Sequence, residues 1–168
     1  MAEKKITVLV HDISSNTLGV ATALAQALAV RFEVQVVGPE IAGGASEMYR
    51  GAFPYTIVPA PRLYRFPDFL WQVGPLLKAI TGDVIIAVKA YADTVPVALW
   101  KRRASGCKVL VYLDEWDAAP FHEEASDPWW KGLLSNLHHP LDDHYFPLVE
   151  RMIRRADGVI SSSSFLQK

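Results

Sequence analysis

Short runs of consecutive apolar residues alternate along the chain with segments in which apolar residues recur every three or four positions. The runs are rich in valine and isoleucine, which is typical of strands buried on both faces of a parallel sheet. The segments with the longer period indicate amphipathic helices. The pattern predicts six strands, at residues 6–10, 34–38, 55–58, 84–88, 108–113 and 158–161.

Local signals for the beginnings and ends of the intervening helices support this pattern. The first helix follows Asn16 and Thr17, either of which can cap its N-terminus. Pro75 interrupts the second helix, so we expect a bend or a shortened first half, and Gly106 ends the third. Because strands and helices alternate, each connection must cross over the sheet. The sequence therefore predicts a single Rossmann-like α/β domain over residues 1–168, with a doubly wound, mainly parallel, six-stranded sheet and helices on both faces.

Composition and charge narrow the function classes. The formal net charge is −1 and no basic stripe is present, which argues against a nucleic-acid partner. The single cysteine, Cys107, cannot form an internal disulfide and so favours a reducing compartment. The N-terminus does not resemble a signal peptide, and no stretch approaches the roughly 20 apolar residues of a membrane-spanning helix. We therefore expect a cytoplasmic protein.

Ligands on a doubly wound sheet bind beyond the carboxyl ends of the strands, near the point where the strand order reverses. The loop after the first strand lacks both the G-x-G-x-x-G fingerprint and the P-loop lysine, which argues against NAD binding and against a P-loop NTPase. It still leads into a helix N-terminus, where backbone amides suit a phosphate. The candidates for phosphate contact are Asn16, Thr17, Leu18 and Gly19. The alternative is that Asn16 or Thr17 only caps the helix and Gly19 packs against a strand.

Charged residues follow the fourth and fifth predicted strands. Lys89 comes directly after the fourth strand, where it can meet an anion, although solvated lysines are also common there. The fifth strand is followed by Asp114, Glu115, Trp116 and Asp117. Carboxylates in this position can bind sugar hydroxyls, hold a metal or act as a base. An acidic loop that only faces solvent is the alternative.

Two further groups lie between the fifth strand and the last helix. The histidines and aspartates of residues 138–144 look like a metal cluster, but their spacing matches no zinc pattern and Pro140 breaks any helix that would align them. A helix entry capped by Asp142 or Asp143 is the better interpretation, and we expect no metal. The tryptophan pair at 129–130 is either a loop anchor or an exposed platform for an acceptor or for peripheral membrane contact.

Three segments of the sequence share features with one known protein family. Residues 6–39 form a strand, a loop with Gly19, an Ala/Leu-rich helix and a strand ending at Val-Gly. Residues 82–117 carry a lysine after one strand and an acidic, tryptophan-bearing segment after the next, and residues 154–168 carry Ala-Asp before a short strand and then serines. Together they resemble the N-terminal domain of group 1 (family 4) glycosyltransferases with the GT-B fold. The sequence departs from that family by having a single glycine in the first loop and by having Asp114 where a histidine is often found.

This resemblance implies retaining transfer of a hexose-like sugar from a nucleotide-sugar to a small-molecule or glycan acceptor, without a cofactor or an obligatory metal. The chain would then be the acceptor-side half of a two-domain enzyme. The donor-binding C-terminal domain would be absent from this sequence, and the fragment alone would be inactive; a natural lone domain is the alternative. The resemblance implies that Lys89, Asp114, Glu115 and Trp116 bind the acceptor and that Asn16–Gly19 contact the donor phosphate.

Two functions from other classes remain open. One is a non-catalytic flavodoxin-like or receiver-like binding module, although a receiver needs an acidic pair after the first strand, where this chain has His11 and Asp12. The other is a metal-dependent hydrolase that uses Asp114, Asp117 and the histidines.

Overall fold

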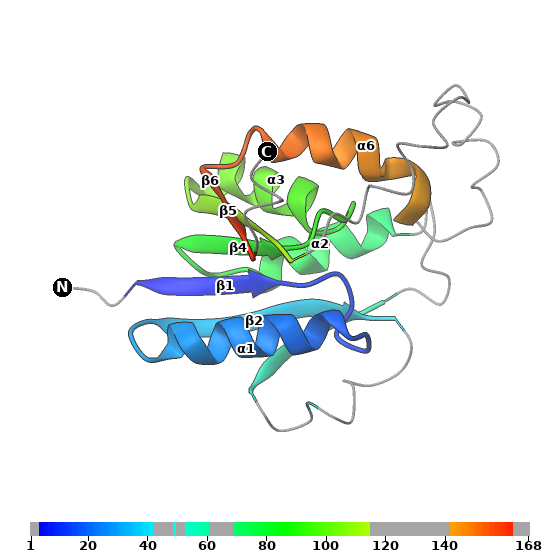
Figure 1. The fold of residues 1–168 in the computed structure, drawn as a ribbon. Coiled ribbons are helices and arrows are strands. Elements are labelled where there is room, and N and C mark those ends of the chain that lie inside the picture. Colours follow the sequence, from blue (N-terminus) through cyan, green and yellow to red (C-terminus); the bar gives the residue numbers. More distant parts are fainter. Residues whose placement is uncertain (1–3, 42–48, 50–52, 61–68, 115–141, 163–168) are drawn as a thin grey trace.

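Six parallel strands form one sheet in the order β3-β2-β1-β4-β5-β6 (Figure 1). The computed structural model describes residues 4–41, 49, 53–60, 69–114 and 142–162, with the backbone only for 142–147. The strands are β1 (Lys5–Leu9), β2 (Glu33–Glu40), β3 (Tyr55–Pro59), β4 (Val84–Val88), β5 (Lys108–Leu113) and β6 (Gly158–Ser161). Each neighbouring pair is parallel, so the predicted sheet is confirmed.

The strand order reverses between β1 and β4. From β1 the chain proceeds outward to β2 and β3, and then returns to the centre to build β4, β5 and β6 on the other side. The register pairs Leu9 of β1 with Ala87 of β4, so these two strands end side by side. The loops that follow them lead to helices α1 (Thr17–Ala29) and α3 (Val95–Ser105) on opposite faces of the sheet, which is the arrangement at which doubly wound sheets bind ligands. The fold therefore places the loops after β1 and β4 next to each other.

Helices cover both faces of the sheet. Helix α1 (Thr17–Ala29) lies on one face, and α2 (Leu70–Ala79), α3 (Val95–Ser105) and α6 (Asp142–Ile153) lie on the other (Figure 1). None of the helices in the described parts of the chain has the length and apolar character needed to cross a membrane.

The core is split into two layers because successive strand residues point to opposite faces. The layer under α1 contains Val8, Val10, Ile13, Leu18, Ala21, Ala25, Val36 and Val88. The layer under α2, α3 and α6 includes Leu9, Val37, Leu76, Ile85, Ala87, Val95, Val109, Val111 and Val149. Both faces of the central strands are thus apolar, as the uninterrupted valine and isoleucine runs predict.

Strand β2 is longer than its apolar run suggests. Gly38-Pro39 closes the run in the sequence, yet the structure continues the strand through both residues to Glu40. A Cβ atom on Gly38 would lie only 2.9 Å from the carbonyl oxygen of Val10. The glycine therefore allows the backbone of β2 to approach the backbone at Val10 closely. The glycine here marks a close contact within the sheet and not a turn.

Two of the three predicted helix boundaries are confirmed and one is wrong. Gly106 ends α3 in the left-handed region, at φ 74°, and donates its amide hydrogen to Arg102 O at 2.7 Å. Helix α2 begins only five residues before Pro75, which gives the shortened first half. Asn16 occupies the N-cap position of α1, but its side chain makes no capping hydrogen bond. Instead Ser15 Oγ accepts a hydrogen bond from Thr17 N at 3.3 Å.

The amino edge of the sheet carries a salt-bridge cluster formed by Arg102, Lys108 and Asp157. The Asp157 carboxylate accepts hydrogen bonds from Val109 N at 2.9 Å, Lys108 Nζ at 3.0 Å and Arg102 Nη1 at 3.2 Å. The bond from Val109 N, followed by the bond from Lys108, lowers the pKa of Asp157 to about 2. This carboxylate ties the start of β5 to α3 and to the turn before β6.

Candidate functional site

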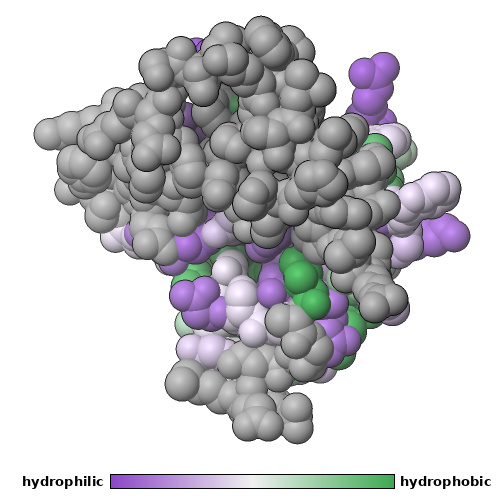
Figure 2. Space-filling view, turned by 90° about the vertical axis from the view of Figure 1, so that its right-hand side faces the viewer, coloured by the Kyte–Doolittle hydropathy of each residue, from purple (hydrophilic) through white to green (hydrophobic). Residues whose placement is uncertain are grey.

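Polar side chains gather at the carboxyl edge of the sheet, at the point where the strand order reverses. His11 and Asp12 follow β1, whereas Lys89, Tyr91 and Asp93 follow β4. Figure 2 looks onto this edge and shows hydrophilic described residues beside a small hydrophobic group in a recess of the surface. The loops after the two central strands thus meet, as the topology requires.

The centre of the site is a histidine–aspartate pair that bridges the two loops. His11 Nδ1 lies 2.9 Å from both carboxylate oxygens of Asp93. The side chain of Asp93 is only 1% exposed and that of His11 only 13%. A carboxylate so deeply buried is strongly disfavoured without a partner, and His11 supplies one. The pair therefore joins residues that are 82 positions apart in the sequence.

This contact determines which nitrogen of His11 carries the proton. An ionised carboxylate can only accept hydrogen bonds, so Nδ1 must be the donor. In the neutral imidazole the lone pair then resides on Nε2. If Nε2 takes up a proton, the negative charge of Asp93 stabilises the resulting imidazolium. This is the arrangement by which an aspartate orients a histidine that serves as a general base.

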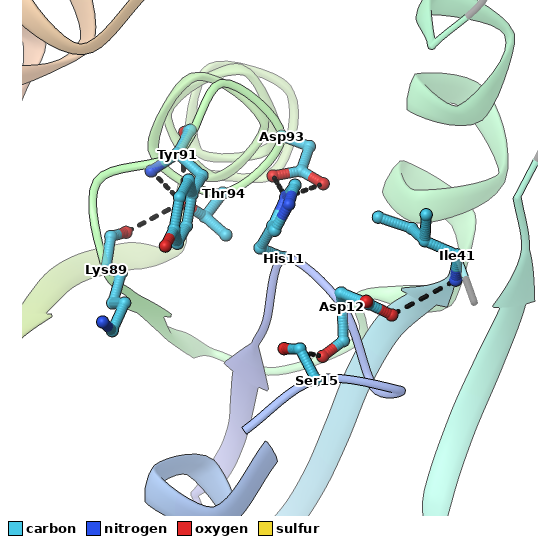
Figure 3. Close-up of polar contacts among 8 residues, drawn as sticks. All are labelled: His11, Asp12, Ser15, Ile41, Lys89, Tyr91, Asp93 and Thr94. Carbon is cyan, nitrogen blue, oxygen red and sulfur yellow. Dashed lines mark hydrogen bonds and ion pairs between the residues drawn. The ribbon is translucent and has the colours of Figure 1, made fainter. Parts of the chain in front are cut away.

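Two contacts from the β4 loop hold the pair in place (Figure 3). The Tyr91 ring stacks on the imidazole of His11, with 4.4 Å between the ring centroids. Thr94 Oγ1 accepts a hydrogen bond from Tyr91 N at 3.0 Å and lies 2.8 Å from the carbonyl oxygen of Lys89, to which it donates. The imidazole is therefore fixed both in its plane and at Nδ1.

Asp12 organises the loop after β1 from within. One of its carboxylate oxygens accepts hydrogen bonds from Ser14 N at 2.8 Å, from the Ser14 hydroxyl and from Ile41 N at 3.2 Å. Its backbone carbonyl accepts a hydrogen bond from Ser15 Oγ at 2.9 Å. The Asp12 carboxylate therefore holds the conformation of the loop after β1. His11 is the candidate functional residue of this loop.

Lys89 lies at the carboxyl end of β4, as predicted, but in an unusual backbone conformation. It has a φ of 62°, in the left-handed region that residues other than glycine seldom occupy. Its amide donates to Tyr112 O at 2.8 Å, which holds this conformation against β5. Backbone strain of this kind costs about 1–3 kcal/mol and tends to occur at functional sites. The solvated-lysine alternative is wrong, because the Lys89 side chain is 8% exposed.

Asp114 faces Lys89 from the end of β5. Lys89 Nζ lies 3.8 Å from Asp114 Oδ1, which is close enough for charge attraction and too long for a hydrogen bond. Oδ1 is buried and has no hydrogen-bond partner among the described residues. The sequence placed Lys89 and Asp114 at this edge separately, and the structure brings them together. An acceptor atom in this state is suited to a hydroxyl group of a ligand.

The predicted phosphate-contact residues form the first turn of α1 and the position before it. The side chains of Thr17 and Leu18 are buried, and Leu18 belongs to the core layer under α1. The amides of Leu18 and Gly19 donate to Ser15 O and Asn16 O, at 3.2 and 2.9 Å. Gly19 contacts the Tyr49 ring, with which a Cβ atom would collide. Asn16 has the exposed side chain of the group, and donor contact there stays a prediction.

Other predicted residues lie outside the described part of the chain. These are Glu115, Trp116, Asp117, the tryptophan pair at 129–130 and the histidines at 138 and 139, while only the backbone of His144 is described. Within the described residues, no group of three or more His, Cys, Asp or Glu side chains is placed to hold a metal ion.

The His11–Asp93 pair is the feature that sequence reasoning missed. Both residues stand in loops that the sequence identified as candidate sites, but they are 82 positions apart and neither belongs to a known motif. The available signal was topological. His11 follows the first strand and Asp93 the fourth, and in a doubly wound sheet these strands flank the reversal point.

Fold and site together define a doubly wound α/β domain with buried polar side chains at the carboxyl edge of its sheet. Residues 19–168 match the family described as glycosyl transferase 4-like domain. The chain belongs to this glycosyltransferase family. A search of curated protein sequences gives no match.

Solved structures of glycosyltransferases share the fold. UGT89C1 of Arabidopsis thaliana, solved with UDP-L-rhamnose, aligns over 97% of this chain and 43% of its own, with a TM-score of 0.62 and 13% identity. LpCGTa, solved with UDP, aligns over 96% of this chain and 46% of its own, with a TM-score of 0.52 and 15% identity. The chain therefore spans less than half the length of these proteins, and its α/β architecture is that of a Rossmann-like domain of GT-B glycosyltransferases.

Proposed function

We propose that this chain is the N-terminal, acceptor-binding half of an enzyme that transfers a sugar from a nucleotide-sugar to an acceptor hydroxyl. The observation that carries the proposal is the buried His11–Asp93 pair at the reversal point of the sheet. Family membership supports sugar transfer. The complexes of UGT89C1 with UDP-L-rhamnose and of LpCGTa with UDP support a nucleotide-sugar as the donor. A receiver-like module would have no use for such a base.

In this proposal His11 is the general base. The acceptor hydroxyl lies at Nε2, which takes up its proton as the oxygen forms a bond to the anomeric carbon of the donor. The bond from that carbon to the phosphate oxygen breaks, and its electron pair leaves with the nucleoside diphosphate. Asp93 stabilises the imidazolium that results. A positioned base of this kind contributes about 10²–10⁴-fold to the rate.

Neighbouring residues bind the two substrates. Asp114 accepts a hydrogen bond from another acceptor hydroxyl through Oδ1, and Lys89 contacts an anionic group of the acceptor or a phosphate. Glu115 and Trp116 continue this acceptor surface. The segment Asn16–Gly19 contacts the donor phosphate from the adjacent loop. The reaction uses no cofactor and no metal, and the donor is held mainly by a C-terminal domain.

The stereochemical outcome has two candidates. The family resemblance implies retention of the anomeric configuration. Inversion is favoured by the His11–Asp93 pair, because attack from the face opposite the leaving group requires a base on the acceptor side. The anomeric proton coupling of the product, measured by NMR, distinguishes the two. Retention with an unaffected His11→Ala variant would show that the proton is removed by another group.

The proposal is tested with the longer protein that contains this chain. Purified protein is incubated with a panel of nucleotide-sugars and hydroxyl acceptors, and both the released nucleoside diphosphate and the glycosylated product are measured. We expect transfer by the longer protein and none by residues 1–168 alone, since in this proposal the donor-binding domain lies outside these residues. Absence of any transfer or nucleoside diphosphate release by the longer protein across the panel would contradict the proposal. The lone cysteine supports a cytoplasmic location, which fractionation of the source cells checks.

A further inference from the structure

The face of the sheet opposite α1 exposes large apolar side chains next to basic ones. Helices α2, α3 and α6 all lie on this face (Figure 1), and Lys101 Nζ of α3 donates to Leu77 O of α2 at 2.8 Å. Each helix connects the carboxyl end of one strand to the amino end of the next, so the three run in the same direction. Their outward sides therefore form one surface.

Each of the three helices has an exposed apolar side chain that is followed by an exposed cation. Residues three, four or seven positions apart share a face of a helix. The exposed residues with this spacing are Trp71 and Lys78 on α2, Trp100 and Arg103 on α3, and Leu148 and Arg151 on α6. We call these six residues the aromatic-basic face. In all three helices the apolar residue lies nearer the carboxyl edge of the sheet and the cation nearer the amino edge.

The exposure of the two tryptophans sets this face apart. Trp71 is 81% exposed and Trp100 is 59% exposed. Tryptophan is a highly buried residue on average, and exposed apolar patches rimmed by polar groups mark interaction sites. The inward sides of the same helices are fully occupied, because Val73, Leu76 and Val97 pack into the core. The two tryptophans therefore do not contribute to the packing of the core of this domain.

The exposed charged side chains described on these three helices are all positive, whereas Glu150 of α6 is half-buried. Besides the three cations of the aromatic-basic face, Arg154 and Arg155 are exposed directly after α6. The nearby Asp157 is paired with Lys108 and Arg102. A surface that combines tryptophan with several cations complements anionic phospholipids, since the indole ring settles at the level of the headgroups and the cations meet their phosphates.

We propose that the aromatic-basic face docks the protein on the surface of a bilayer that contains acidic phospholipids. The bilayer is favoured over a protein partner because the apolar groups are spread along three parallel helices, whereas a protein interface concentrates them in a central patch. In this orientation the helices lie along the membrane and the carboxyl edge with His11 and Asp93 remains open at the side. This proposal is independent of the proposed enzymatic function.

Flotation with lipid vesicles tests the proposal on the longer protein that contains this chain. The vesicles consist of phosphatidylcholine alone or of phosphatidylcholine mixed with phosphatidylglycerol. We expect binding to the mixed vesicles only, and weaker binding as salt is added, since salt screens the cations. Binding to neither vesicle, or equal binding to both, would overturn the proposal.

Paired variants identify the face. Trp71→Ser with Trp100→Ser, and separately Lys78→Glu with Arg103→Glu, should each lower the vesicle affinity by more than about tenfold. The matched control is Val30→Ser with Arg31→Glu at the end of α1 on the opposite face, where Val30 is 82% exposed. An equal loss in the control, or unchanged vesicle affinity in the tryptophan pair, contradicts the proposal. The proposal is also contradicted if these variants change the oligomeric mass of the protein and not its binding to vesicles, because a second copy of the chain would then cover the face. Melting temperatures equal to that of the wild type confirm that each variant is folded.

Discussion

The two edges of this sheet use the same kinds of charged residue in different ways. At the amino edge, Asp157 is satisfied by three donors and its contacts link neighbouring elements. At the carboxyl edge, the buried Asp93 contacts His11 across two loops, Lys89 has a left-handed backbone, and Asp114 Oδ1 lacks a hydrogen-bond partner among the described residues. The first edge is arranged for stability. The second edge holds a buried acceptor atom, Asp114 Oδ1, that has no hydrogen-bond partner among the described residues.

This difference predicts that substitutions at the two edges affect separate properties. Changes at the carboxyl edge should lower activity, and the melting temperature should fall only where a contact of the buried Asp93 is removed, as in His11→Ala. Changes at the amino edge should lower the melting temperature and leave the kinetics intact. A protein whose function resides elsewhere would show no such separation.

The largest effect is expected for His11→Ala, measured as kcat/KM of the longer protein. Loss of the general base should reduce kcat/KM by about 10²–10⁴-fold. The substitution also removes the contact of His11 with the buried Asp93 carboxylate, so the melting temperature must be measured in parallel. Full activity in a folded His11→Ala variant would remove His11 from the chemistry.

The next largest effect is expected for Asp93→Asn. The amide can donate a hydrogen bond to Nδ1, which would favour the tautomer that carries the proton on Nε2 and so block proton uptake there. We expect a fall in kcat on the order of 10²-fold, near the lower limit for a lost base. The fold should persist, because the amide is nearly the same size as the carboxylate. A change confined to KM would assign Asp93 to substrate binding.

Asp114→Asn should have a smaller effect. If Oδ1 accepts a hydrogen bond from the acceptor, weakening that bond should cost about 1.5–3 kcal/mol, which is on the order of tenfold or more in kcat/KM. Glu115→Gln tests the adjacent carboxylate in the same assay. Wild-type kinetics in both variants would remove Asp114 and Glu115 from the acceptor site.

The smallest effect on activity, namely none, is expected for Asp157→Asn. This variant should melt at a lower temperature than the wild type at neutral pH. The pKa of Asp157 is about 2 in the folded protein and 3.8 for the free side chain. Its stabilising effect is therefore present above about pH 4 and is lost as the pH falls towards 2. The difference in melting temperature should shrink over that range, and a difference independent of pH would contradict the assignment.

The sequence predicts the sheet well because a strand buried on both faces needs an uninterrupted apolar run. All six strands appear within two residues of their expected bounds. The exceptions have local causes. The second strand continues through Gly38 because that glycine permits a close approach to Val10, and Ser15 takes the capping role expected of Asn16 or Thr17.

The site is only half predictable from sequence. Lys89 and Asp114 follow apolar runs, so their positions at the carboxyl edge could be inferred, but their contact with each other could not. His11 and Asp93 are joined by the strand order β1-β4, which depends on the packing of the whole sheet. No local pattern encodes a contact of this kind, because it arises only when two distant strands become neighbours.

The proposed chemistry requires His11 and Asp93 to act as one unit, and a double-mutant cycle measures this directly. The quantity is kcat/KM for the wild type, His11→Ala, Asp93→Asn and the double variant of the longer protein, with Asp157→Asn as the folded control. If Asp93 acts only through His11, the double variant should be no less active than His11→Ala alone. Losses that multiply would contradict this account, since they would mean that the two residues serve the reaction independently.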